Sequence, residues 1–419
     1  MPVAVTPVST SMTQATLSTR WTQLVLGLIA MMSISSPQYV WTLFTKSFQD
    51  NLHTNLAAIQ ITFSIVIVLQ TWLSPLQGYL VDKFGPRLLI AIGCLMSGLG
   101  WVASAYVTNL AGLYFTYGLF CGVGTGIVYI GIIGLMVRWF PDRRGFATGM
   151  VAAGYGFGAI ATTFPIDTML KSEGYQHTLV VFGVILGIVG AVAALFLRMP
   201  GPADALPPAP AMASSRDVAP KAMLRSKVFW LMFVMMTMMS TGGLMIISQF
   251  AAFSRDFGVA SVMVFGLAAL PLALTVDRIT NGLTRPFFGW VSDRIGRENT
   301  MAIAFLMEAA AVTIMILFRD NALVFVCLSA VVFFGWGEIF SLFPSTLTDT
   351  FGTQYATTNY GFLYMAQGIG SVLGGPLAAL LHDATGSWLP VFGIIIALDI
   401  LTGVLALAVL KPMRRAYSP

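Results

Sequence analysis

The sequence contains Gly78-Tyr-Leu-Val-Asp82-Lys83-Phe-Gly85 and repeats the pattern 211 residues later as Gly289-Trp-Val-Ser-Asp293-Arg294-Ile-Gly296. The offset is half of the 419-residue chain. A Gly-x-x-x-Asp-[Lys/Arg]-x-Gly loop that recurs at half the chain length indicates two copies of one membrane bundle, a duplication typical of transport proteins. The repeat therefore makes transport the first hypothesis.

The composition is that of a membrane protein. Hydrophobic residues make up 57% of the chain and charged residues only 9%, with a mean hydropathy of +0.82, whereas a soluble domain carries about 25% charged residues. Apolar runs of roughly 20 residues, the length that crosses a bilayer, occur twelve times, six in each half. We therefore predict an all-α membrane protein with twelve transmembrane helices in two six-helix bundles related by pseudo-two-fold symmetry.

The order of the apolar runs predicts the domain organisation. We expect a cytoplasmic N-terminal tail, an N-terminal bundle, a cytoplasmic linker, a C-terminal bundle and a cytoplasmic tail, at residues 1–21, 22–197, 198–228, 229–410 and 411–419. The linker contains six of the twenty prolines, which favours an extended, solvated segment. All but six of the 22 Lys and Arg residues fall in the tails, the linker or the loops on the same side. The positive-inside rule then places both termini in the cytoplasm.

Other classes of function are disfavoured. The three cysteines have no paired spacing, so we expect neither a disulfide nor a metal site, and no cofactor. The net charge of +5 forms no basic run, which argues against a nucleic-acid partner. No nucleophile, metal cluster or nucleotide loop indicates an enzyme. We expect a monomer whose partners are the lipid bilayer, a small carboxylate substrate and, in one alternative, protons.

Charges inside the predicted spans are the best indication of a site, because each costs roughly 2.5 kcal/mol or more at the bilayer centre. The first half has only Asp167, near the outer end of a span. The second half has six, all well inside their segments: Asp277, Arg278, Arg285, Glu308, Glu338 and Asp399. We therefore expect the second bundle to provide the charged side chains of the site and the first bundle to determine its shape.

The span predicted at residues 262–288 has a polar face. Asp277, Asn281 and Arg285 are spaced by four and form one stripe, with Arg278 nearly in line with Arg285. Internal ion pairs that serve only packing are an open alternative for Asp277 and Arg278. For Arg285 we favour binding, because a guanidinium keeps its charge and its planar fork fits a carboxylate. Arg285 is the candidate carboxylate anchor.

The repeated loops, between the second and third and the eighth and ninth spans, resemble the signature loop of the major facilitator superfamily. The resemblance covers essentially the whole chain. It implies two bundles around a central cavity that opens alternately to each side, with the loops acting as a conformational latch. The gating candidates are Gly78, Asp82, Arg87, Gly289, Asp293 and Arg297.

Further motifs occur in both halves: Gln38-Tyr39-Val-Trp41-Thr42, Gly126-Ile-Val-Tyr129, Ala153-Gly154-Tyr155-Gly156, Asn281-Gly282-Leu-Thr-Arg285-Pro286, Phe334-Gly-Trp336-Gly337 and Asn359-Tyr360-Gly361-Phe362. Together they resemble the oxalate:formate antiporter family, which is similar in turn to the monocarboxylate transporters. The resemblance implies that Arg285 is the anchor and that the cavity is lined by Gln38, Tyr39, Tyr129, Tyr155 and Trp336. For each aromatic residue alone, helix packing or an interfacial belt is the alternative.

One position departs from that family. Where the antiporter has a second cation, a lysine on the eleventh span, this chain has Gln367. A dianion buried against a single arginine would leave one charge unpaired. Two possibilities stay open: Arg278 replaces the lysine, or Asp277 neutralises Arg278. If Asp277 neutralises Arg278, Arg285 leaves the site with a net charge near +1. That charge favours a monocarboxylate, or a dicarboxylate that carries a proton.

Two coupling mechanisms also stay open. In exchange, an empty cationic site resists reorientation until an anion neutralises it. In proton symport, Asp277, Glu308 or Glu338 carries a proton, because desolvation favours a protonated acid; each could instead be permanently paired in a structural role.

The predicted function is secondary active transport of small organic anions by alternating access across the cytoplasmic (inner) membrane. Alternatives are a proton-coupled symporter of the lactate and pyruvate type, a carrier of a larger flat solute, and a non-transporting membrane sensor.

Overall fold

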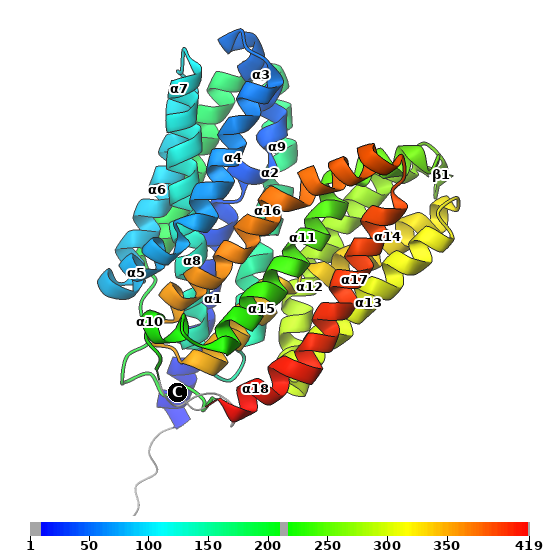
Figure 1. Ribbon diagram of the computed structural model, residues 1–419. Helices are drawn as coiled ribbons and strands as arrows, with labels where there is room; N and C mark the ends of the chain where they lie inside the picture. The colour runs from blue at the N-terminus through cyan, green and yellow to red at the C-terminus, as the bar shows by residue number, and fades with distance from the viewer. Residues whose placement is uncertain (1–9, 210–216, 418–419) are drawn as a thin grey trace, which may run out of the picture.

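The computed structural model describes residues 10–209 and 217–417, and most of them are helical. The remaining parts of the predicted tails and linker, at residues 1–9, 210–216 and 418–419, lie outside the described residues. The helices form two bundles, one from each half of the chain, and Figure 1 shows the first in blue to green-cyan and the second in green to red.

The first bundle consists of α1 (Thr10–Ser33), α2 (Ser36–Tyr39), α3 (Trp41–Leu52), α4 (Leu56–Trp72), α5 (Ser74–Phe84), α6 (Pro86–Ser104), α7 (Leu110–Leu113), the π-helical segment η1 (Tyr114–Cys121), α8 (Gly122–Trp139) and α9 (Arg144–Leu195). The short helix α10 (Pro220–Met223) lies between the bundles in the sequence.

The second bundle consists of α11 (Lys227–Asp256), α12 (Ala269–Ile295), α13 (Arg297–Leu317), α14 (Ala322–Trp336), α15 (Ile339–Phe351), α16 (Ala356–Thr385), α17 (Leu389–Leu405), the π-helical segment η2 (Ala406–Leu410) and α18 (Lys411–Ala416). Between α11 and α12, β1 (Met263–Val264) and β2 (Leu267–Ala268) form a small antiparallel hairpin.

Most of the helices have the length and composition of membrane-crossing segments. Within the described residues, eight helical stretches are long and apolar enough to cross a bilayer, and two bent pairs, with angles of 46° and 50°, add two more. The long helix α9 contains two segments, because Gly174 interrupts it with a φ of 83° that residues with a side chain rarely adopt. Helix α12 is 27 residues long, but its charged residues make it less apolar than these stretches. The all-α, two-bundle prediction is confirmed.

The bundles meet where the repeated loops begin. Helix α5 packs against α16, and α9 packs against α12. A Cβ atom on Gly78 would collide with the backbone of Thr357 and Thr358, and one on Gly289 would collide with the backbone of Gly145. The first glycine of each repeated pattern therefore allows two helices from different bundles to approach at backbone distance.

The two repeated aspartates make matched contacts with the opposite bundle. Asp82 accepts hydrogen bonds from the Thr358 N–H (2.8 Å) and hydroxyl (2.6 Å) at the start of α16. Asp293 accepts hydrogen bonds from the N–H groups of Gly145 (3.0 Å) and Phe146 (2.9 Å) at the start of α9. Each acid thus lies at the N-terminus of a helix in the other bundle, where unpaired N–H groups favour a negative charge.

A buried carboxylate strengthens this junction. Asp349, on α15, binds Arg144 of the first bundle (2.6 Å) and Arg297 of the second (2.8 Å), and Arg297 also contacts Asp293 (2.6 Å).

The two predicted gating arginines, Arg87 and Arg297, do not make equivalent contacts. The Arg87 side chain is exposed and forms no hydrogen bond or ion pair within residues 10–209 and 217–417. In the first bundle it is Arg138 that binds Asp82, at 2.6 Å.

The opposite ends of the bundles diverge. In Figure 1 the bundles are together near α10 and separate toward the ends that carry α3, α7 and β1. Among the described residues, the hydrogen bonds and ion pairs that join the bundles include none from α3, α7 or the hairpin. The fold is therefore closed at the repeated loops.

We expect Asp349→Asn to lower the free energy of unfolding by about 3 kcal/mol, because it leaves two buried guanidinium groups without their shared carboxylate. Thermal unfolding in detergent measures the change. The matched control is Asp50→Asn, which removes an exposed ion pair with Lys46 and should leave the unfolding temperature unchanged. Equal effects of the two variants would contradict a stabilising role for Asp349.

Candidate functional site

Arg285 lies at the contact between the bundles. It is on α12, is 3% exposed, and donates a hydrogen bond from Nη1 to the backbone carbonyl of Ala152 in α9 (2.5 Å). Its Nη2 donates to Asn281 (3.1 Å), one turn away on the same helix, as the predicted stripe requires. The guanidinium also lies over the ring of Phe340 at 4.6 Å, a favourable cation–π contact.

No acid neutralises Arg285 within the part of the chain that the structure describes. A guanidinium has five N–H donors, and here Nε is buried without any acceptor. A buried charge without a counter-charge is strongly unfavourable. The site is therefore electrostatically incomplete and complementary to an anion.

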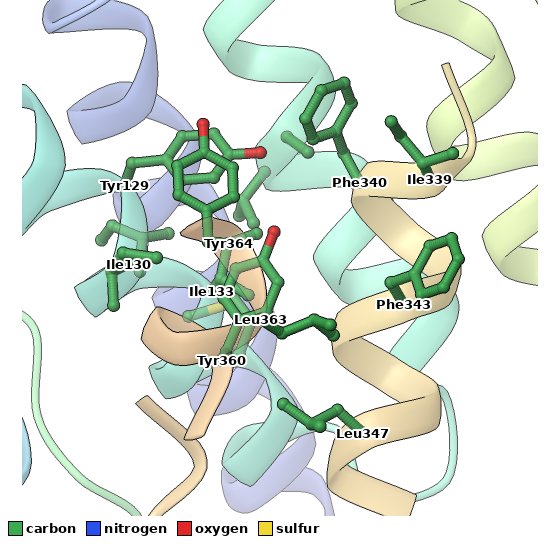
Figure 2. Close-up of a cluster of buried hydrophobic side chains, with 14 of the residues drawn as sticks. Tyr129, Ile130, Ile133, Ile339, Phe340, Phe343, Leu347, Tyr360, Leu363 and Tyr364 are labelled. Carbon is green, nitrogen blue, oxygen red and sulfur yellow. The ribbon is translucent and has the colours of Figure 1, made fainter. Parts of the chain in front are cut away.

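Four tyrosine hydroxyl groups lie within electrostatic reach of Arg285: those of Tyr129, Tyr155, Tyr360 and Tyr364. Tyr129, on α8, stacks on Tyr364, on α16, with ring centroids 4.9 Å apart. Figure 2 shows these two rings lying over each other, with Phe340 on α15 at the other side of the cluster. The buried hydroxyls of Tyr129 and Tyr360 lie beside each other, and neither has any other hydrogen-bond partner in the described structure. Aromatic walls and unused donors thus surround the cation.

The first bundle contributes an uncharged polar cluster. The Tyr155 hydroxyl donates to Gln38 Oε1 (2.6 Å), and Gln70 Nε2 donates to the same oxygen (3.1 Å). The ring of Tyr39 packs edge-on against Tyr155 at 5.4 Å. Tyr39 is 42% exposed, so it connects this cluster to the surface. Helix α2, which carries Gln38 and Tyr39, positions them just before the bend into α3.

Trp336 and Gln367 form no hydrogen bond with Arg285 in the described structure. Trp336 donates its indole N–H to the carbonyl of Met239 (2.9 Å) inside the second bundle and packs against Phe340 at 5.6 Å. It therefore supports the residue that covers Arg285. Gln367 is buried on α16, three residues after Tyr364, and its Oε1 has no partner among the described residues.

Asp277 and Arg278 lie on different sides of α12. Asp277 is buried and accepts a hydrogen bond from Ser329 on α14 (3.0 Å), while its second oxygen has no partner in the described structure. Arg278 is exposed and forms no ion pair with any described residue. The possible neutralisation of Arg278 by Asp277 does not occur in this structure, because adjacent helical residues point about 100° apart.

The structure adds residues that sequence reasoning did not assign to the site. Gln70 completes the Gln38 cluster, Phe340 covers Arg285, and Tyr360 and Tyr364 extend the aromatic cluster that contains Tyr129. Tyr360, Tyr364 and Gln367 are spaced by four and three, which places them on one helix face. This spacing could have indicated from the sequence that one face of α16 belongs to the site. Nothing comparable indicated Phe340, since its role depends on how α15 meets α12.

Two helical bundles that meet around a buried, unneutralised cation define a membrane transport protein rather than an enzyme. The chain belongs to the Major Facilitator Superfamily, whose family description matches residues 24–278 and 272–418. It is a multi-pass membrane protein.

Particular relatives narrow this assignment. The chain is 36% identical to the oxalate:formate antiporter of Oxalobacter formigenes over 403 residues, which cover 95% of this chain and 93% of that protein. It is 25% identical to monocarboxylate transporter 13 of Bos taurus, over 78% of this chain and 74% of that protein. The predicted resemblance to both families is confirmed.

A solved structure shares the fold. The crystal structure of the Major Facilitator Superfamily transporter FucP in the outward conformation matches this chain with a TM-score of 0.68. The match covers 91% of this chain and 97% of the FucP chain. The sequence identity is 16%, so the likeness concerns the fold alone.

We expect Tyr155→Phe to lower the free energy of unfolding by about 1 kcal/mol, because Gln38 loses the hydroxyl that donates to its buried oxygen. Thermal unfolding in detergent tests this, with Tyr106→Phe as the matched control, since Tyr106 is 69% exposed. If both variants unfolded alike, the Tyr155–Gln38 hydrogen bond would not contribute to stability.

Proposed function

We propose that this chain is a secondary active transporter of small organic anions and that Arg285 binds the substrate carboxylate. The observation that carries the proposal is the buried guanidinium without a counter-charge. A bound carboxylate supplies that charge and accepts the N–H groups that the protein leaves unused. The names of the relatives, an oxalate:formate antiporter and a monocarboxylate transporter, support the same substrate class.

The surroundings of Arg285 suit a small, flat ligand. Tyrosine hydroxyls donate hydrogen bonds to carboxylate oxygens, and their rings bury apolar surface. Tyr129, Tyr155 and Gln38 come from the first bundle, whereas Arg285 and Gln367 come from the second. A substrate held between them contacts both bundles, so its binding can influence how the bundles move relative to each other. Trp336 acts indirectly, because it packs against Phe340, whose ring covers Arg285.

The charge of the site favours one negative charge on the substrate. Arg285 is the cation of the site, because Gln367 is neutral and Arg278 is exposed. A monocarboxylate, or a dicarboxylate that carries a proton, balances Arg285, whereas an oxalate dianion leaves one charge over. Exchange of the oxalate and formate type and proton-coupled monocarboxylate symport are the two candidate reactions. The name of one relative supports exchange of oxalate and formate, and the name of the other supports transport of monocarboxylates.

The repeated loops act as the latch in this proposal. We place both termini in the cytoplasm and the protein, as a monomer, in the cytoplasmic (inner) membrane. With that orientation the contacts of Gly78, Asp82, Gly289, Asp293 and Arg297 close the cytoplasmic end. Substrate then enters from the outer side, and breaking these contacts opens the inner side.

Counterflow in liposomes tests the anchor. Purified protein is assayed with labelled oxalate, formate, lactate and pyruvate. We expect Arg285→Ala to lower counterflow about a hundredfold, and Arg285→Lys about tenfold, because an ammonium group lacks the planar fork. Arg319→Ala, which removes an exposed arginine, is the control and should transport normally.

Unchanged counterflow in Arg285→Ala would exclude the anchor. Absence of counterflow for all four anions, in folded wild-type protein, would contradict the proposed substrate class and favour a larger flat solute or a non-transporting sensor.

We expect Gln367→Lys to strengthen the inhibition of counterflow by oxalate about tenfold relative to formate, because a second cation balances the second charge of the dianion. Competition at fixed pH measures the ratio. Gln176→Lys adds the same charge at an exposed position and should leave the ratio unchanged. An unaltered ratio in Gln367→Lys would place residue 367 away from the bound anion.

A further inference from the structure

Three acids from different elements are buried together in the second bundle. Glu308 is on α13, Glu338 lies at the break between α14 and α15, and Asp399 is on α17. Each is fully buried, and none of their six carboxyl oxygens has a hydrogen-bond partner within the described residues. Helix α13 packs against both α14 and α17, and a Cβ atom on Gly335, one turn before Glu338, would collide with the side chain of Glu308. We call these three residues the acid cluster.

No cation balances the acid cluster among the described residues. The charged side chains on the elements around it are either exposed or engaged elsewhere. The exposed ones are Arg278, Arg294, Lys227 and Arg255. Two charged residues of α12 have other partners: Arg285 binds Ala152 and Asn281, and Asp277 binds Ser329. The remaining basic residues are also engaged, since Arg297 binds Asp293 and Asp349, Arg414 binds Glu298, and Lys411 binds Asn299. Several buried carboxylates cannot all stay ionised without a counter-charge.

The surroundings restrict what can bind there. The space beside Glu308, lined also by Gly243, Phe333 and Trp336, does not admit a water-sized sphere. Within the described residues, no group of three or more acids, histidines or cysteines is arranged to hold a metal ion. A hydrated cation or a metal therefore does not fit, whereas a proton needs no additional volume.

The acid cluster is connected to Arg285 through the break between α14 and α15. Gly335 packs directly on Glu308, and Trp336 lines the space beside Glu308 while its ring contacts Phe340. Phe340, two residues after Glu338, lies over the Arg285 guanidinium. The same short segment thus touches the acids on one side and the cation on the other. A shift of the break changes both environments.

We propose that Glu308, Glu338 and Asp399 form a proton-binding site, separate from the anion site, whose protonation is linked to anion binding at Arg285 through the α14–α15 break. This inference rests on the proposed transport function and assigns its coupling ion. In each cycle one carboxylate of the acid cluster accepts a proton on the side where the anion binds. It releases that proton on the side where the anion leaves. One proton accompanies one monovalent anion, so their charges cancel.

The test separates exchange from net transport. Wild type, Glu308→Gln, Glu338→Gln, Asp399→Asn and the triple variant are placed in liposomes that contain a pH-sensitive dye. Labelled pyruvate and oxalate are used in two assays: counterflow at equal pH, and net uptake into substrate-free liposomes with an acidic exterior. The matched control is Asp167→Asn, an acid in the first bundle that forms a partly exposed ion pair with Lys171.

We expect wild type and Asp167→Asn to show both activities, with acidification of the lumen during net uptake. The acid-cluster variants should keep counterflow within about twofold of wild type, whereas net uptake and the dye signal fall about tenfold or more. A variant that fails to fold loses counterflow as well, which distinguishes damage from uncoupling.

Two results would overturn the inference while leaving the proposed function intact. One is wild-type counterflow without any proton-driven uptake. The other is an equal fall of counterflow and net uptake in all the acid-cluster variants, including Glu308→Asp, which would assign the acids a structural role. Absence of wild-type counterflow for both anions would overturn the proposed function and this inference together.

Discussion

The Asp349 carboxylate is the interaction on which the arrangement of the two bundles depends. It binds Arg144 from one bundle and Arg297 from the other, in a place from which water is excluded. Ionic contacts of this kind are strong only while each charge has its partner. They hold the ends at the repeated loops together, and the glycines there let the backbones touch. Because that end is fixed, α12 lies against α9 and Arg285 reaches Ala152.

Charge is divided between the bundles in a way that suits a carrier. The first bundle presents glutamines and tyrosines around the site, whereas the second holds the central cation and the buried acids. Arg285 lies at the interface, and the acid cluster lies inside its own bundle. Opposite charges are thus kept apart instead of forming a permanent pair. A paired arginine and glutamate would stabilise one conformation, whereas separated charges leave each free to respond to a mobile ion.

Much of the fold could be predicted from residue pattern, and less of the site. The repeated loop and the apolar runs determine two bundles, because their signals are local and periodic. Arg285 was identified from residue type and membrane depth. Partners from distant segments were not predictable: Asp349 meets Arg144 across 205 residues, and only the docked helices bring them together. Arg278 illustrates a different limit, since the sequence places it on the same face of α12 as Arg285 but does not indicate that Arg285 is buried and Arg278 exposed.

The uncompensated guanidinium of Arg285 has an electrical consequence. In the proposed cycle the empty carrier holds the positive charge of Arg285 and the negative charge of one deprotonated carboxylate in the acid cluster. The loaded carrier holds a bound monovalent anion and a proton as well, so the two forms have the same net charge. A unit charge that crosses the full field changes the energy by about 2.3 kcal/mol per 100 mV. Membrane voltage therefore acts alike on the loaded step and on the return of the empty carrier, and it drives no net uptake of a monovalent anion. The separate cation and acids thus make the proton gradient, and not the membrane voltage, the driving force for a monovalent anion in this cycle.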